Sequence, residues 1–122
     1  MIKEKNAAVR FSQVGESLIA QITGEIDHHT AKHLREEIDG QMYALSPKEV
    51  TIGLSGVSFM DSSGLGLVVG RLVTAKEVGC TLTLTGVDAR TMRIFEMAGL
   101  ERMRGLTICR QEKGKTKNEK NV

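Results

Sequence analysis

Segments with the periodicity of β-strands and of α-helices alternate along most of this chain, and this alternation restricts the possible folds more than any other feature. Two candidate strands, 7–11 and 18–23, flank the turn residue Gly15, which predicts an antiparallel hairpin. The later candidates are a helix over 30–45, a strand over 49–54, a helix over 62–78, a strand over 81–85, a helix from 88 to 99 and a strand over 105–109. Strands separated by helices pair in parallel through right-handed crossovers, so a mixed sheet is expected.

The alternation inside the later strands predicts how many layers the domain has. In the segment 49–54, Val50, Ile52 and Leu54 alternate with Thr51 and Gly53, and the segment 81–85 alternates in the same way. A sheet covered by helices on both faces has nearly continuous apolar strands instead. We therefore expect a two-layer α/β domain, in which the helices lie mainly on one face of the mixed sheet.

Each predicted helix carries one apolar stripe, which should face the sheet. Pro47, Gly79 and Gly99 follow the three helices, at positions where a helix is expected to end. The stripe residues are Leu34, Ile38, Met42 and Leu45 in the first helix, Leu65, Val68, Val69 and Leu72 in the second, and Met92, Phe95 and Ala98 in the third. Asp88 is the expected N-cap of the third helix.

The net charge of +2 is divided unevenly along the 122 residues. Residues 110–122 contain five basic and two acidic side chains, which makes this segment +3 and leaves −1 for residues 1–109. The same segment has no apolar residue before Val122. We therefore expect one domain over 1–109 and a basic, disordered tail over 110–122. Because the basic balance belongs to the tail, the sequence does not predict direct nucleic-acid binding.

Composition also excludes several classes of protein. No apolar run approaches the ~20 residues of a membrane span, and the N-terminal segment lacks the apolar stretch of a signal peptide. Two cysteines, Cys80 and Cys109, are too few for a multi-bridge disulfide framework or a four-cysteine zinc site. We therefore expect a cytoplasmic protein with no membrane partner.

A run of small polar residues and glycines over 59–66 lies where a predicted strand gives way to a helix. In the simpler interpretation, Asp61 or Ser62 caps the helix and the glycines permit close packing. In the functional interpretation, a serine hydroxyl at the start of a helix receives or holds a phosphate. The run lacks the lysine of a P-loop and the G-x-S-x-G pattern of a nucleophile elbow, so neither site is predicted.

A second polar run, GEIDHHT, precedes the first helix, which Asp27 or Thr30 could cap. His29, His33 and Glu37 are spaced along one helical stripe, but the neighbouring sequence offers no further metal ligand. No metal site is therefore predicted. A serine paired with His28 or His29 would lack a third orienting group, so no catalytic residues are predicted either.

Three stretches together resemble one protein family. They are GEIDHHTAKHLREEI at 24–38, SGVSFMDSSGLGLVVGR at 55–71 and MRIFEMAGL at 92–100. These stretches resemble the bacterial anti-sigma factor antagonists, whose fold is the STAS domain, and the resemblance covers 7–109. The Asp-His-His-Thr and Met-Asp-Ser-Ser-Gly-Leu-Gly segments are most similar to the sporulation group, which antagonises the anti-sigma-F factor. The paired motifs in order are more specific than either alone.

The resemblance implies a regulatory protein without catalytic activity or cofactor. In this family, the unphosphorylated antagonist binds an anti-sigma factor that is also an ATP-dependent serine kinase, and the sigma factor is released. The kinase then phosphorylates the first serine after the motif aspartate, which is Ser62 here. The modified antagonist dissociates, and a metal-dependent serine phosphatase restores it.

Both polar runs follow predicted strands and should emerge at the same edge of the sheet, so we expect them to form one partner-binding surface. Its expected residues are Asp27, His28, Thr30, Asp61, Ser62, Ser63, Gly64 and Leu65. Two alternatives remain: a STAS-type sensor of a nucleotide or small ligand, and a phosphoryl-transfer or receiver domain that uses Asp27 or Asp61. A receiver needs an acidic magnesium cluster and a lysine that this sequence does not offer in place.

Overall fold

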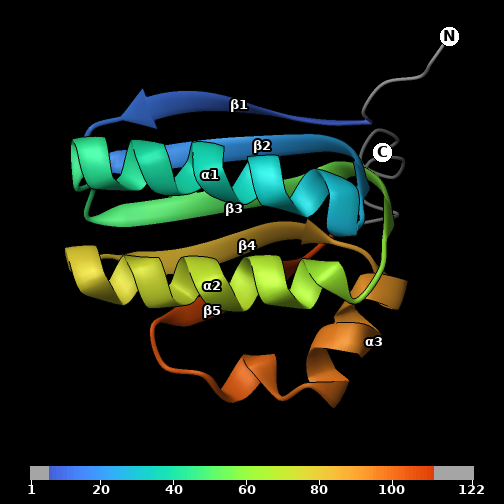
Figure 1. Cartoon of the computed structure of the whole chain (residues 1–122). Helices are drawn as coiled ribbons and strands as arrows, with labels where there is room; N and C mark the ends of the chain where they lie inside the picture. Colours follow the sequence, from blue (N-terminus) through green and yellow to red (C-terminus); the bar gives the residue numbers. More distant parts are fainter. Residues whose placement is uncertain (1–5, 112–122) are drawn as a thin grey trace, which may run out of the picture.

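The computed structural model describes residues 6–111, which form a five-stranded sheet, three α-helices and one short 3₁₀ helix (Figure 1). The elements in chain order are β1 (Ala7–Val14), β2 (Ser17–Ile26), α1 (His28–Leu45), β3 (Glu49–Met60), α2 (Ser63–Val78), β4 (Thr81–Val87), α3 (Ala89–Met97), η1 (Leu100–Arg102) and β5 (Leu106–Arg110). The predicted tail beyond Gln111 lies outside the described residues, and β5 ends at Arg110.

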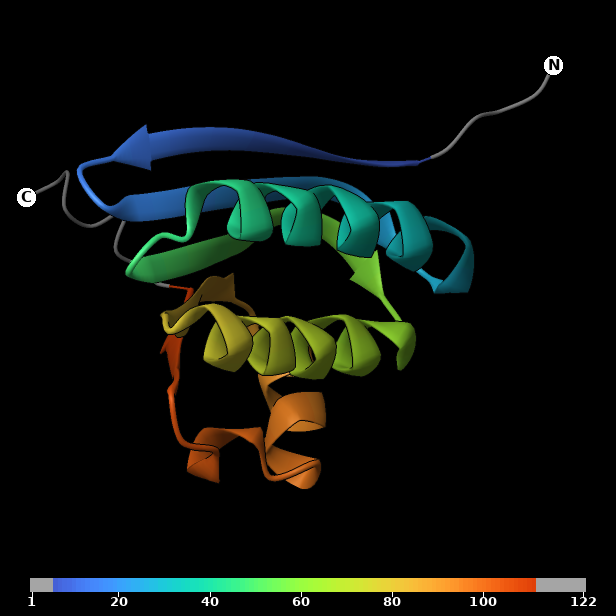
Figure 2. The ribbon, with the colours of Figure 1, turned by 60° about the vertical axis from the view of Figure 1, so that its left-hand side comes forward.

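The strands lie in the sheet in the same order as in the sequence, from β1 to β5. β1 and β2 form the predicted antiparallel hairpin, and the three remaining neighbour pairs are parallel. The crossovers between the parallel strands pass through α1, α2 and α3. Figure 1 and Figure 2 both show α1 and α2 side by side on one face of the sheet, with α3 beyond α2 toward the β5 edge. The predicted mixed sheet with helices mainly on one face is confirmed.

The core lies between the sheet and the two long helices. Alternate residues of β2, β3 and β4 are buried and face α1 and α2, and burying each such side chain contributes about 1.5–3 kcal/mol before conformational entropy is subtracted. The principal core residues are Leu18, Ala20, Ile22, Val50, Ile52, Leu82 and Leu84 from the strands and Leu34, Ile38, Met42, Leu67, Val68 and Leu72 from the helices. Threonines occupy intervening positions of three neighbouring strands: Thr51 pairs with Thr83, which pairs with Thr107.

The first four strands are longer than predicted, and β3 shows why. It continues from Leu54 to Met60, through a segment whose alternation is lost. Two register shifts in the β2–β3 pairing, between Gln21 and Thr23 and between Gly24 and Glu25, change which residues of β3 face the core. A bulge inserts an extra residue and breaks the period of two, so this half of β3 does not look like a strand in the sequence.

Two residues of the predicted apolar stripes are exposed. Leu45 is the last residue of α1, and Ser46 after it adopts a left-handed conformation. Ala98 is the C-cap of α3. Both residues lie at the end of their helix, where the chain turns away from the sheet. The predicted burial of the last stripe residue was therefore wrong for α1 and α3.

We expect Gly86→Ala to destabilise the domain more than Gly79→Ala. Both glycines have positive φ, +68° and +78°, so both substitutions carry the cost of a left-handed alanine, about 1–2 kcal/mol. A Cβ on Gly86 would also lie 2.7–2.9 Å from Ser55 atoms, including its backbone N and Cα, whereas one on Gly79 would meet no atom within 4 Å. Equal losses of unfolding free energy in urea would contradict this account.

Candidate functional site

The two polar runs meet at one edge of the sheet, at the carboxyl ends of β2 and β3. Ile26 and Met60 are partners in the parallel ladder, and the Asp61 N–H donates to the Ile26 carbonyl at 3.1 Å. The residue after each strand end begins a turn into a helix, Asp27 before α1 and Asp61 before α2. The turns are therefore neighbours, although 34 residues separate these two aspartates in the sequence.

Asp27 caps α1 through a closed set of hydrogen bonds. Its Oδ1 accepts from the N–H groups of His29 (2.9 Å) and Thr30 (3.0 Å), while the Asp27 N–H donates to Thr30 Oγ1 at 3.0 Å. The Thr30 hydroxyl in turn donates to the Glu25 carbonyl at 2.8 Å. These bonds satisfy amides that the first turn of a helix leaves without partners. The hydrogen bond from the Thr30 amide is the main cause that lowers the pKa of Asp27 below its ordinary 3.8, with the His29 amide contributing in the same direction.

The turn before α2 is capped by Asp61 and not by Ser62. Asp61 Oδ1 accepts from the Ser63 N–H at 2.8 Å, and the Asp61 carbonyl accepts from the Gly64 N–H at 2.9 Å. The Ser62 side chain is exposed and makes no capping hydrogen bond. The hydroxyl of Ser62 is therefore available at the surface, at the first turn of a helix where the backbone dipoles favour negative charge.

Close packing holds the first turn of α2 against the end of β3. Gly64 is buried, and a Cβ on it would overlap Sδ and Cγ of Met60. Leu65 is half-buried against the core. The absence of a side chain at Gly64 thus lets α2 begin directly beside β3, which sets the position of Ser62.

An ion pair ties α1 to α2 behind the turns. Arg71 of α2 is 4% exposed, and its Nε lies 2.8 Å from Oδ1 of Asp39 in α1, while Nη2 donates to Oδ2 at 3.2 Å. Burial lowers the pKa of Arg71, and the charge of Asp39 opposes that shift. This contact links the two helices whose first turns form the site.

The eight residues predicted for partner binding differ in their exposure to solvent. His28 and Ser62 are exposed, and Asp27, Asp61, Ser63 and Leu65 are half-buried. Thr30 is only 4% exposed and Gly64 is buried, so both lie beneath the surface and support the residues above them.

Sequence reasoning missed two residues at the same edge, Phe59 and Arg90. Phe59 is 47% exposed and pairs with Glu25 in the ladder. Arg90, in the first turn of α3, lines a small crevice together with Phe59 and Met60. The rule that parallel strands end at one edge of a sheet could have pointed to Arg90, because α3 follows β4 as α2 follows β3.

The histidines near the start of α1 do not assemble a metal site. His28 and His29 have ring centroids 4.2 Å apart, and His33 Nδ1 lies 3.0 Å from Glu37 Oε2. In residues 6–111 no group of three or more histidine, cysteine, aspartate and glutamate side chains is arranged to hold a metal ion. Within the same part of the chain, no helix is both long and apolar enough to cross a membrane.

We expect Asp27→Ala to lower the melting temperature at neutral pH, with a deficit relative to the wild type that shrinks in acid. Because the folded-state pKa of Asp27 is depressed, its contribution is present above the unfolded-state pKa and is lost as the pH falls through the folded value. The matched variant Asp27→Asn keeps a capping oxygen, so its deficit at pH 7 should be smaller, and it should also shrink in acid because the wild type loses its carboxylate there. Melting curves from pH 7 to pH 3 check this, and a deficit of Asp27→Ala that stays constant to pH 3 would contradict it.

Comparison with known proteins places the chain in one family. The STAS domain family model matches residues 8–113. The anti-sigma-B factor antagonist of Bacillus subtilis (strain 168) is 35% identical over 96 residues, covering 79% of this chain and 86% of the relative. The anti-sigma F factor antagonist of Paenibacillus polymyxa is 32% identical over 83 residues, covering 68% of this chain and 71% of the relative.

A solved structure gives the same fold. The anti-sigma factor antagonist SpoIIAA in its unphosphorylated form superposes with a TM-score of 0.71, covering 94% of this chain and 98% of that one at 23% sequence identity. The fold and the sequence relatives thus lead to one conclusion: the chain belongs to the STAS domain family, among the anti-sigma factor antagonists.

Proposed function

We propose that this protein binds an anti-sigma factor that is also a serine kinase, and that phosphorylation of Ser62 ends this binding. The proposal rests on one observation in the turn before α2: the side chain of Asp61, and not that of Ser62, makes the capping hydrogen bond. Asp61 caps the helix, which leaves the exposed Ser62 hydroxyl free to accept a phosphoryl group. The protein is then a substrate of the kinase and not itself a catalyst. While it is unphosphorylated, it occupies the anti-sigma factor and frees the sigma factor.

The docking surface of this proposal is the pair of turns at the ends of β2 and β3. Their juxtaposition by the Ile26–Met60 pairing lets one partner contact both turns at once. Phe59 adds an exposed aromatic ring beside them, and aromatic side chains are frequent anchors in protein interfaces. The buried Thr30 and Gly64 maintain the shape of this surface from beneath.

Charge explains how one phosphate would act as the switch. Phosphorylation adds about −1.5 to −2 charges to a turn that already carries the Asp61 carboxylate, with Asp27 in the neighbouring turn. The first turn of α2 offsets part of the new charge, by about 0.3–1 kcal/mol, so the fold tolerates it. Against an acidic partner group at 4 Å, each unit charge costs about 1 kcal/mol in water and about 4 kcal/mol near a protein surface. Values in this range weaken binding roughly ten- to a thousandfold.

The reverse step requires a serine phosphatase, which we propose to be of the metal-dependent class. Phosphate on Ser62 would lie at the surface, where a second enzyme can reach it. Hydrolysis restores the hydroxyl and with it the form that binds the anti-sigma factor. The crevice lined by Met60 and Arg90 offers about 30 Å³, room for one water molecule, whereas sites for small ligands span about 300–1,000 Å³. This size favours the switch over a sensor that holds a nucleotide in the crevice.

We expect Ser62→Ala to abolish phosphorylation by the cognate kinase and to leave binding to that kinase intact. The neighbouring Ser63→Ala is the matched control, because the Ser63 contribution to the turn is its backbone N–H and not its hydroxyl. It should still accept one phosphate. Mass spectrometry with site mapping after incubation with kinase and ATP checks both variants, and phosphate found on Ser63 alone would refute the assignment.

We also expect the affinity for the anti-sigma factor to fall ten- to a thousandfold when Ser62 carries phosphate. The motif resemblance to the sporulation group favours an anti-sigma-F factor as the partner, and the relatives include antagonists of both anti-sigma F and anti-sigma-B factors. Titration calorimetry with a purified factor of each kind measures both points. Asp27→Ala should weaken binding, whereas Thr107→Ala on β5 should not. Equal affinity of the two phosphorylation states would contradict the switch.

A further inference from the structure

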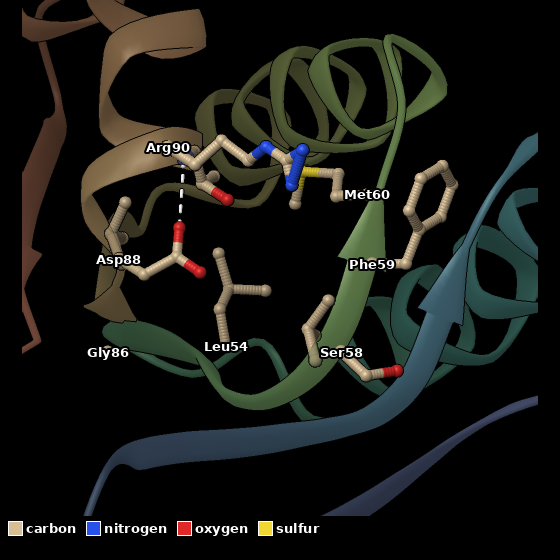
Figure 3. A pocket seen from close by; sticks show the side chains of 10 residues that line it. Leu54, Ser58, Phe59, Met60, Gly86, Asp88 and Arg90 are labelled. Carbon is tan, nitrogen blue, oxygen red and sulfur yellow. Dashed lines mark hydrogen bonds between the residues drawn. The ribbon is translucent and has the colours of Figure 1, made fainter.

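A crevice opens where β3 separates from β4, immediately before the Ser62 turn. The β3–β4 ladder stops at the pair Gly53–Thr85, whereas β3 continues to Met60 with β2 as its only ladder partner in the described residues. The last residues of β3 form one wall of the crevice, and the β4–α3 connection forms the other (Figure 3). The Met60 wall leads directly into Asp61 and Ser62.

Arg90 of α3 lines the wall of the crevice that the β4–α3 connection forms, and it has no acidic partner among the described residues. It is exposed, and within residues 6–111 it forms no ion pair and no side-chain hydrogen bond. Figure 3 shows its side chain extending across the crevice toward the sulfur of Met60. The adjacent carboxylate of Asp88 is occupied as the cap of α3, since its Oδ1 accepts from the Thr91 N–H at 2.8 Å.

Met60 also contacts the first turn of α2, because any Cβ on Gly64 would overlap its side chain. Arg90 and Met60 line the same crevice, and Figure 3 shows the guanidinium directed toward the Met60 sulfur. Ser62 follows Met60 by two residues, so the guanidinium is directed toward the segment that holds Ser62. Arginine also matches a phosphate geometrically, because two of its N–H groups can donate to two phosphate oxygens.

We propose that Arg90 captures the phosphoryl group of phosphorylated Ser62 within the same molecule. This inference rests on the proposed modification of Ser62 and adds the residue that receives its charge. The titratable groups at these strand ends include Glu25 beside Phe59, Asp61 beside Ser62, Asp27, His28 and His29 from the turn into α1, and Asp88 and Arg90 from the turn into α3. Among these groups, Arg90 carries the guanidinium, which can donate two N–H groups to one phosphate.

Capture by Arg90 would hold the phosphate over Met60 and the crevice. The repelling charge would then stay in one place on the docking surface instead of moving with a free serine side chain. A phosphatase would have to displace Arg90 before it could reach the phosphorus atom, so the pair would also prolong the phosphorylated state. Arg90 is a positioning residue in this account and takes no part in the transfer itself.

The test uses full-length protein with phosphoserine inserted at position 62 during translation, which needs no kinase. Phosphorus-31 NMR then measures the second pKa of the phosphate. A nearby positive charge favours the dianion, so Arg90→Ala should raise this pKa by about half a unit or more, and Arg90→Lys should raise it less. Arg93→Ala is the matched control: it removes the same charge from an exposed position of α3 that does not line the crevice.

Equal phosphate pKa values in the Arg90→Ala and Arg93→Ala proteins would overturn the proposal. A second readout is the Nε–H signal of Arg90 in nitrogen-15 spectra, which should shift between the serine and phosphoserine forms, while that of Arg93 should not. Failure of the proposed function would look different. A kinase that modifies another residue would refute the role of Ser62 in the switch, yet would leave the phosphoserine measurements unchanged.

Discussion

The pairing of Ile26 with Met60 is the contact on which the candidate site depends. It aligns the ends of two parallel strands, and the hydrogen bond from the Asp61 N–H to the Ile26 carbonyl carries the alignment one residue into the turn. Each turn then enters a helix that packs on the same face of the sheet (Figure 1). Displacing either strand by one residue would move its apolar positions to the wrong face, so core burial and site geometry enforce the same register.

In both turns an aspartate accepts hydrogen bonds from N–H groups in the first turn of a helix, but the groups left exposed differ. In the first, the Asp27 carboxylate and the Thr30 hydroxyl are both engaged with backbone groups. In the second, Asp61 alone serves as the cap, and the Ser62 hydroxyl is left at the surface. A modification of Ser62 therefore costs no helix cap. In the proposed function, this separation of the structural carboxylate from the exposed hydroxyl would let the phosphate be added while the fold stays intact.

The extension of β3 past its ladder with β4 shapes the surroundings of Ser62. After Gly53, β3 no longer pairs with β4, and its last residues pair with β2 alone within the described part of the chain. A crevice opens between these residues and the connection into α3 (Figure 3). Three strand ends thus contribute to one surface, through Asp27, Ser62 and Arg90. Under our proposal, Arg90 near the end of β4 would respond to a phosphate placed on Ser62 near the end of β3.

The sequence by itself determined the two-layer architecture, the crossovers and the neighbourhood of the two polar runs, because alternation and helical stripes record which face of each element is buried. It left open whether Asp61 or Ser62 caps α2, and it did not indicate the bulges in β3, the burial of Thr30 or the direction of the Arg90 side chain. Those features depend on strands that pair across the chain and on side chains that contact residues distant in sequence. Only the tertiary structure decides them, since local periodicity does not indicate which distant strand or side chain a residue contacts.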